Sequence, residues 1–189
     1  MRKIIFMMSV SLDGFFEGPD RDLGWQLIDE ELHSHFNQWL GAAGGFLDGR
    51  VTYELMAEHW PTADTDPAAT ASVREFAGIW RDMPKVVYSR TLQSADWNAA
   101  VVRDVVPAEV MELKAQPGGD LVIGGSVLAE AFLAHDLIDE FRLYVQPILL
   151  GRGRLLFRPS DAPVPLRLAE ARPFANGVVL LRYERPATS

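Results

Sequence analysis

The stretch from residue 120 to residue 133 limits most strongly what this chain can fold into. It reads Asp-Leu-Val-Ile-Gly-Gly-Ser-Val-Leu-Ala-Glu-Ala-Phe-Leu, so an apolar run meets a glycine pair and apolar residues then return at helical spacing. This order predicts a strand over residues 121–123, a tight turn at Gly124 and Gly125, and a helix over residues 126–135. The first backbone N–H groups of a helix have no partners within it, so such a junction can bind an anionic phosphate. A tight strand-to-helix connection that binds nothing is the alternative.

The rest of the chain alternates between apolar runs and segments with helical spacing. The predicted helices cover residues 29–40, 51–59, 73–80 and 107–115, and the predicted strands cover residues 4–10, 45–49, 85–89, 100–106 and 141–150. Residues 11–22 are expected to form a loop and residues 61–70 a surface connection. Near the end, residues 166–171 and 178–184 flank Asn176-Gly177, a strong hairpin signal. Helices between strands, followed by an antiparallel hairpin, predict an α/β fold with a mixed, mostly parallel sheet.

Length and composition predict an ordinary globular chain. The 189 residues are 48% hydrophobic and 23% charged, and no linker divides them, so we expect a single domain over residues 1–189. No apolar run approaches the ~18 residues that a membrane span needs. The absence of cysteine excludes disulfides and thiolate chemistry and is compatible with the cytoplasm, where we expect the protein to lie.

The charge balance limits the partners. The formal net charge is −8, which argues against a nucleic-acid surface because such a surface needs a basic patch. The four histidines have no metal-binding spacing, so no metal site is predicted and the histidines are expected on the solvated surface. We therefore expect a small-molecule ligand, with neither nucleic acid nor membrane as a partner.

Five motifs occur in one order along almost the whole chain. They are Ser11-Leu-Asp-Gly, Gly49-Arg-Val-Thr-Tyr-Glu, Tyr88-Ser-Arg, Ile123-Gly-Gly-Ser-Val-Leu, and Leu137-Ile-Asp-Glu-Phe-Arg-Leu-Tyr-Val-Gln-Pro-Ile-Leu-Leu-Gly-Arg-Gly. Together they resemble the dihydrofolate-reductase fold, and in particular the branch that contains the C-terminal reductase domain of the riboflavin-biosynthesis deaminase-reductase. The resemblance implies three layers, with a central mixed sheet of about eight strands and helices on both faces. It also implies NADPH as the cofactor.

The resemblance places the cofactor on residues of three of these motifs and of the first strand. The implied contacts are Met8, Ser9, Gly49, Arg50, Val51, Thr52, Ser89, Arg90, Ile123, Gly124, Gly125, Ser126, Val127 and Leu128. The two arginines would favour NADPH over NADH because the additional 2′-phosphate needs cations. The resemblance also implies a cis peptide in the glycine pair. Ordinary turns with exposed arginines at solvated strand ends are the alternative for these positions.

The substrate side offers fewer signals. Hydride transfer requires a proton source near the acceptor, and the resemblance implies a carboxylate on the first helix a few residues after a loop tryptophan. Counting from Trp25 favours Glu30 as this catalytic acid, and Asp13 is a second candidate at the end of the first strand. The resemblance places Trp25 and Gln146 in the substrate pocket. The alternatives are a helix start rich in acidic residues and an aspartate that only shapes a turn.

These observations lead to three functional hypotheses. The first is an NADPH-dependent reductase that transfers hydride to a small heterocycle, such as a pterin or a flavin precursor. The second is an NADPH-binding sensor or regulatory module without catalysis, and the third is a structural oligomer. A homodimer is expected, because the apolar strand at residues 141–150 and the arm at residues 178–181 expose more apolar surface than one chain covers.

Overall fold

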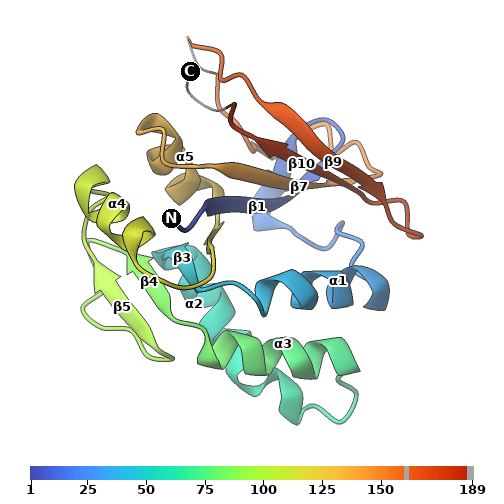
Figure 1. The fold of residues 1–189 in the computed structure, drawn as a ribbon. Coiled ribbons are helices and arrows are strands. Elements are labelled where there is room, and N and C mark those ends of the chain that lie inside the picture. The colour runs from blue at the N-terminus through green and yellow to red at the C-terminus, as the bar shows by residue number, and fades with distance from the viewer. Residues whose placement is uncertain (160–161, 187–189) are drawn as a thin grey trace.

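The computed structural model describes residues 1–159 and 162–186 and is built around one eight-stranded sheet (Figure 1). The strand order is β5-β4-β3-β6-β1-β7-β10-β9. The strands are β1 (Ile4–Ser11), β3 (Gly45–Gly49), β4 (Lys85–Tyr88), β5 (Ala99–Val102), β6 (Leu121–Gly124), β7 (Glu140–Gln146), β9 (Arg167–Pro173) and β10 (Val179–Glu184). From β5 to β7 all neighbours are parallel, and β10 is antiparallel to both β7 and β9. The predicted mixed, mostly parallel sheet is confirmed.

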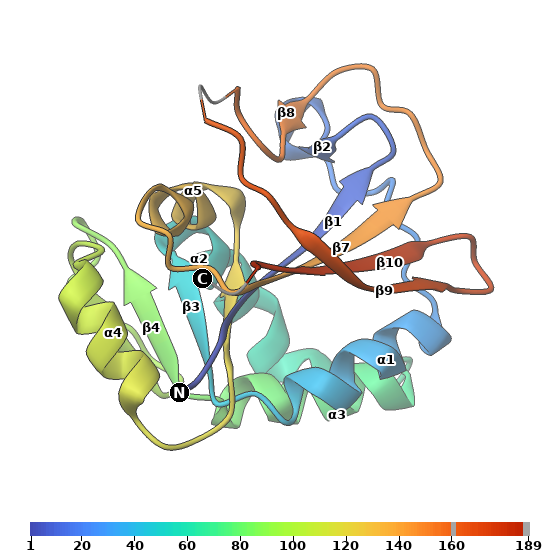
Figure 2. The same ribbon diagram turned by 45° about the horizontal axis from the view of Figure 1, so that its top comes forward.

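Helices cover both faces of this sheet (Figures 1 and 2). They are α1 (Glu30–Leu40), α2 (Arg50–His59), α3 (Ala71–Asp82), α4 (Pro107–Ala115) and α5 (Ser126–Ala134), with short 3₁₀ turns η1 (Pro19–Arg21) and η2 (Trp60–Thr65). The core on one face joins the sheet to α1, α2 and α3, and the core on the other joins it to α4 and α5. The expected three-layer α/β architecture is therefore confirmed.

The central strands are buried on both faces, which is why their sequences are almost continuously apolar. In β6, Leu121 and Ile123 pack toward α5, whereas Val122 packs toward α1 and α3. Each fully buried side chain of this size contributes ~1.5–3 kcal/mol. The sheet is thus held in place by two separate apolar layers.

Two predicted segments differ in the structure. The expected strand at residues 141–150 ends at Gln146, because Pro147 has no N–H with which to continue the ladder. The expected loop at residues 11–22 contains β2 (Phe15–Glu17), which pairs with β8 (Arg154–Leu155) in a second, two-stranded sheet. Both strands of this pair are short, so neither carries a readable alternation of apolar and polar residues.

Two further corrections concern the ends of elements. The strand expected at residues 100–106 is β5 and stops at Val102, and the helix expected at residues 73–80 is α3, which runs two residues further at each end. Its start is set by Thr70, whose hydroxyl accepts a hydrogen bond from Val73 N–H.

In the part of the chain that is described, no helix has both the length and the apolar character needed to cross a membrane.

Candidate active site

The ends of β3, β6 and β1 form one edge of the sheet. β6 enters between β3 and β1, so that Gly124 at its end is paired with Asp48 of β3 on one side and Met7 of β1 on the other. β4 continues this edge, with Tyr88 paired with Gly49. In open α/β sheets, ligands bind at the carboxyl ends of the strands where the chain order reverses. The predicted cofactor segments are therefore brought together at the position where such a ligand would bind.

Two helices start at this edge without a side chain that caps them. α2 follows Gly49 directly and α5 follows Gly125, and neither helix start has a side-chain hydrogen bond, whereas α1 is capped by Asp29. The two starts are close, since a Cβ on Gly49 would lie 3.9 Å from Cβ of Leu128. The unpaired N–H groups of both first turns can therefore bind the same polyanion.

Gly125 can only be glycine in this backbone. Its φ is +94°, and an added Cβ would collide with Oγ1 of Thr52 in the first turn of α2. The described residues contain no cis peptide bond, so the peptide between Gly124 and Gly125 is trans and the cis peptide implied by the resemblance is wrong here. The glycine pair nevertheless brings the backbone of β6 into contact with α2.

The predicted cofactor residues differ in what they can present. Ile123 and Leu128 are buried in the core, so only their backbone can face a ligand, whereas Val51 and Val127 are 40% and 62% exposed. Ser89 is buried, and its hydroxyl accepts hydrogen bonds from the N–H groups of the following turn. Met8 and Ser9 are half-buried near the end of β1.

Both predicted arginines lie at the surface in ion pairs. Arg50 contacts Glu54 at 2.7 Å and Arg90 contacts Asp104 at 2.5 Å, and all four side chains are well exposed. Exposed pairs of this kind contribute little stability, so a phosphate can displace the carboxylates at low cost. Arg103, at the end of β5, donates a hydrogen bond to the carbonyl of Arg90 at 3.5 Å. This third cation was not predicted from the sequence, because Arg103 lies inside the strand expected at residues 100–106 and follows β5 only in the structure.

The predicted substrate half of the site, around Trp25 and Gln146, lies on the face of β1 and β7 that α1 covers. Because side chains alternate along a strand, Ser9 and Ser11 of β1 share this face with Met7, and Tyr144 and Gln146 of β7 lie on it as well. Gln146 is completely buried, and its Oε1 accepts a hydrogen bond of 2.9 Å from Leu27 N–H. Trp25 is half-buried in the same loop and donates through Nε1 to the carbonyl of Asp22.

Asp13 is tied to the chain by three hydrogen bonds. Its carboxylate accepts from Ser11 Oγ at 2.6 Å, Leu150 N–H at 3.0 Å and Gly151 N–H at 2.7 Å. These bonds, that from Ser11 first, lower the pKa of Asp13. The contacts suit an ionised residue that fastens the loop after β1 to residues 150–151, and a catalytic role for Asp13 remains a prediction.

Glu30 also has structural partners. Its two oxygens accept hydrogen bonds from Ser72 N–H at 3.1 Å and Ser72 Oγ at 2.8 Å, at the start of α3. The bond from Ser72 is the main cause of the lowered pKa of Glu30. An ionised group is a poor proton donor, so this contact gives Glu30 a role in joining α1 to α3, and catalysis by Glu30 remains a prediction.

Two histidines are not on the solvated surface, contrary to the prediction. His33 packs against the rings of Trp60 and Phe76, and Nε2 of His35 lies 3.2 Å from the hydroxyl of Tyr144. Burial lowers the pKa of both histidines. Both histidines lie on α1 and contact aromatic residues of the core. Their spacing of two residues in the sequence did not reveal these contacts. Among residues 1–159 and 162–186, no group of three or more potential metal ligands comes together.

Asp48 is a second residue that the sequence argument missed. It is the next-to-last residue of β3, its side chain is 5% exposed, and burial raises the pKa of its carboxyl group from 3.8 to about 7. Lys85 on the neighbouring strand opposes this rise. Oδ1 of Asp48 would lie 3.2 Å from a Cβ on Gly124, so the Asp48 carboxyl group packs against the glycine pair.

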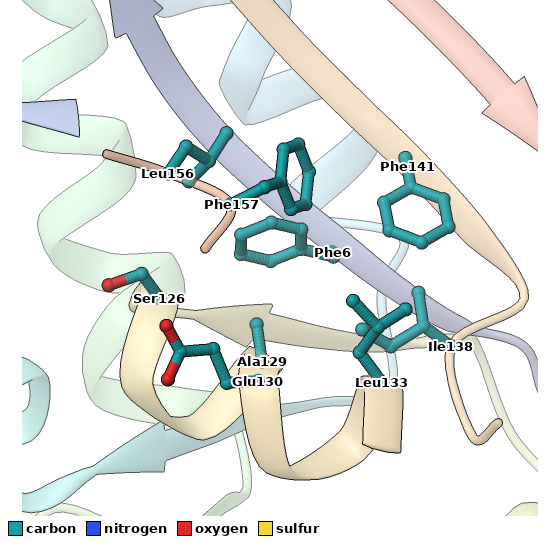
Figure 3. A pocket seen from close by; sticks show the side chains of 9 residues that line it. All are labelled: Phe6, Ser126, Ala129, Glu130, Leu133, Ile138, Phe141, Leu156 and Phe157. Atoms are coloured by element: carbon teal, nitrogen blue, oxygen red, sulfur yellow. The ribbon is translucent and has the colours of Figure 1, made fainter. Parts of the chain in front are cut away.

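One cavity lies beside α5 and another lies near the start of β6. A small apolar one sits between α5 and residues 156–157, with Ser126 and Glu130 on one side (Figure 3). Its volume of about 10 Å³ is about that of one water, which is too small for a heterocycle. The other, of about 200 Å³, lies near the start of β6 and is lined by Trp39 and Arg142 among others.

Comparison with known proteins decides the family. The family model described as the RibD C-terminal domain matches residues 2–180. The chain belongs to the RibD C-terminal domain family. This is the reductase domain of RibD, and the reductases of this family typically use NAD(P)H. The resemblance drawn from the five motifs is confirmed.

Individual proteins are similar to this chain over almost its whole length. The uncharacterized protein YyaP of Bacillus subtilis is 33% identical over 183 residues, covering 96% of this chain and 94% of YyaP. A putative riboflavin biosynthesis protein from Shewanella has the same fold, with a TM-score of 0.76, 22% identity and coverage of 97% and 99%. The deaminase/reductase of Thermotoga maritima matches with a TM-score of 0.67 and 14% identity, and this chain covers 57% of its length.

Proposed function

We propose that this chain is an NADPH-dependent reductase that transfers hydride to a small heterocycle, such as a pterin, a flavin precursor or a related compound. The observation that carries the proposal is the pair of uncapped helix starts at α2 and α5, separated only by the glycine pair. Two adjacent sets of unpaired N–H groups suit a pyrophosphate. The acidic, cysteine-free composition supports a cytoplasmic location as part of this proposal.

The residues at the edge fit such a cofactor. The first turns of α2 and α5 would bind the pyrophosphate, and Arg50, Arg90 and Arg103 would neutralise the 2′-phosphate. The backbone at Met8 and Ser9 would face the nicotinamide ring. When bound, the cofactor would supply the hydride. The chain itself would bind and orient the cofactor and the substrate, and α1 would shield the substrate half from water.

The NADPH preference is tested with the double variant Arg50→Ala/Arg90→Ala. Each charge-assisted contact is worth ~1.5–3 kcal/mol, so the Kd for NADPH should rise by more than a hundredfold while that for NADH scarcely changes. Isothermal titration calorimetry with both nucleotides measures this. Arg158→Ala is the matched control, because Arg158 forms a similar exposed ion pair with Glu130 at 2.9 Å. An equal loss for the two nucleotides would remove the 2′-phosphate assignment.

A second candidate, an NADPH-binding regulatory module, is favoured by one observation. Both predicted catalytic carboxylates are engaged elsewhere, Asp13 with residues 150–151 and Glu30 with Ser72. The two candidates differ in turnover. Substrate-dependent loss of NADPH absorbance in a heterocycle screen supports the reductase, whereas tight NADPH binding without turnover of any compound supports the regulatory module.

We also propose that the protein is a homodimer. The face of β7, β10 and β9 on the side of α5 carries apolar side chains that are partly exposed: Leu143, Val145, Val179, Leu181, Tyr183 and Leu168. Leu155 and Phe157 are 46% and 44% exposed. The ring of Phe157 contacts Phe141 of β7 on this same side of the sheet. A second copy is an economical cover for such a face.

A further inference from the structure

The side-chain amide of Gln146 is only half satisfied. Gln146 is 0% exposed, and its Oε1 accepts the hydrogen bond from Leu27 N–H. Its Nε2 is buried without a hydrogen-bond partner among the described residues. The orientation of the amide follows from chemistry, since only the oxygen can face an N–H donor. A buried donor without an acceptor is unfavourable and calls for an explanation.

The place of this donor points to a ligand. Gln146 is paired with Ser11 at the end of β1, and Ser9, beside which the nicotinamide is proposed to lie, is one position back on the same face. A heterocycle that receives hydride from the nicotinamide must lie over this face. The Nε2–H group is therefore beside the space that the reacting ring would occupy.

The same amide also holds the loop above it. Within residues 23–28, Gln26 N–H bonds to Leu23 O and the Trp25 ring bonds to Asp22 O, so these contacts stay inside the loop. The bond from Leu27 to Gln146 is the described hydrogen bond that joins residues 23–28 to the sheet. This bond therefore fixes the position of the loop relative to the end of β7.

Both predicted catalytic acids are engaged by other groups of the chain. Asp13 and Glu30, the two acids that the sequence placed here, are occupied by backbone N–H groups and hydroxyls. A ring with an amino or amidinium edge needs a carboxylate acceptor. The group that remains free is the Nε2–H donor of Gln146, which favours a ring that presents a hydrogen-bond acceptor.

We propose that Gln146 determines specificity: its Nε2–H group donates to a carbonyl oxygen of the substrate, and its Oε1 holds Leu27 so that the loop at residues 23–28 is positioned over the ring. The substrate class is then a neutral heterocycle with a carbonyl on this edge. This inference rests on the proposed reductase function, which supplies the position of the ring. Gln146 thus couples recognition of the carbonyl to the position of the loop.

The test uses two isosteric probes, quinazoline-2,4-dione and 2,4-diaminoquinazoline, which carry carbonyl and amino groups at the same ring positions. Calorimetry on the full chain should show that the wild type binds the dione at least tenfold more tightly than the diamine. Gln146→Glu keeps an oxygen for Leu27 but replaces the donor with an acceptor, so the preference should reverse. Gln146→Met removes both groups, so the preference should vanish and the Leu27 amide should exchange faster with deuterium.

The chain offers a matched control for this test. Asn176, in the turn between β9 and β10, also accepts a backbone N–H through its amide oxygen and also has a buried amide nitrogen without a partner. Asn176→Asp should leave the dione preference unchanged. Failure of the wild type to bind the dione, equal affinity for the two probes, or a dione preference that survives in Gln146→Glu and Gln146→Met overturns the proposal.

The test of Gln146 can be distinguished from the test of the proposed reductase function. The probes are titrated without nucleotide, and NADPH is titrated separately into each variant. Unchanged NADPH affinity in Gln146→Glu and Gln146→Met shows that both variants are folded. A wild type that does not bind NADPH would remove the reductase proposal, whereas intact NADPH binding without a probe preference would remove only the role of Gln146.

Discussion

Asp48 should make the protein less stable as the pH rises through the neutral range. None of the hydrogen bonds or ion pairs among the described residues involves its carboxyl group, and burial raises its pKa to about 7. The unfolded chain releases this proton near pH 3.8, so between the two pKa values the folded state binds more protons. The contribution of Asp48 to stability is therefore fully present below the unfolded-state pKa of 3.8 and is lost as the pH rises through the folded-state pKa of about 7.

The size of the effect follows from the two pKa values. A separation of about three units corresponds to ~4 kcal/mol over the whole range, of which ~2.5 kcal/mol is lost between about pH 5 and pH 7.5. Asp48→Asn keeps the shape but cannot ionise. The free energy of unfolding of Asp48→Asn minus that of the wild type should therefore increase by ~2.5 kcal/mol over this interval. Urea denaturation followed by tryptophan fluorescence measures both proteins.

Taking the difference between the two proteins removes the titration of the shared groups that do not interact with Asp48; Lys85, which does, is the exception. His33 and His35, whose pKa values are lowered, contribute equally to both curves. The control is Asp64→Asn, because Asp64 is paired with Arg81 at 2.7 Å and its pKa is lowered, so its difference curve should be flat over the same interval. A flat curve for Asp48→Asn as well would refute the reasoning, since it would show that Asp48 titrates alike in the folded and unfolded chain.

Two further predictions concern the glycine pair and the apolar face. Gly125→Ala should lower the free energy of unfolding by ~1–3 kcal/mol because the residue must keep a positive φ. Gly124→Ala, with a Cβ at 3.2 Å from Asp48 and no positive φ, should cost less in the same urea denaturation; a larger cost for Gly124→Ala would contradict the backbone argument. Leu181→Arg should convert a dimer of about twice 21.1 kDa into the 21.1 kDa chain in light scattering, whereas Arg172→Glu on the opposite face should not. A wild type of 21.1 kDa at all dilutions would exclude the dimer.

The sequence predicted the parts of this fold that depend on local patterns. The helix at residues 107–115 has the predicted bounds, and the junction at Gly124 and Gly125 forms the predicted strand, turn and helix start. These elements follow from proline at a helix start and from glycine at a positive φ. The pairing of β2 with β8 could not be predicted in this way, because it joins residues that are more than a hundred positions apart.

The same distinction applies to the candidate site. The proposed phosphate side consists of helix starts and the residues next to them, so short local motifs were sufficient to predict it. On the substrate side, each polar group is defined by a distant partner: Asp13 by residues 150–151, Glu30 by Ser72, and Gln146 by Leu27, which is 119 positions away. Which carboxylate is occupied and which amide nitrogen is left without an acceptor therefore becomes visible only in the folded chain. For this reason the choice of hydride acceptor is better sought in the free donor of Gln146 than in the acids that the sequence first suggests.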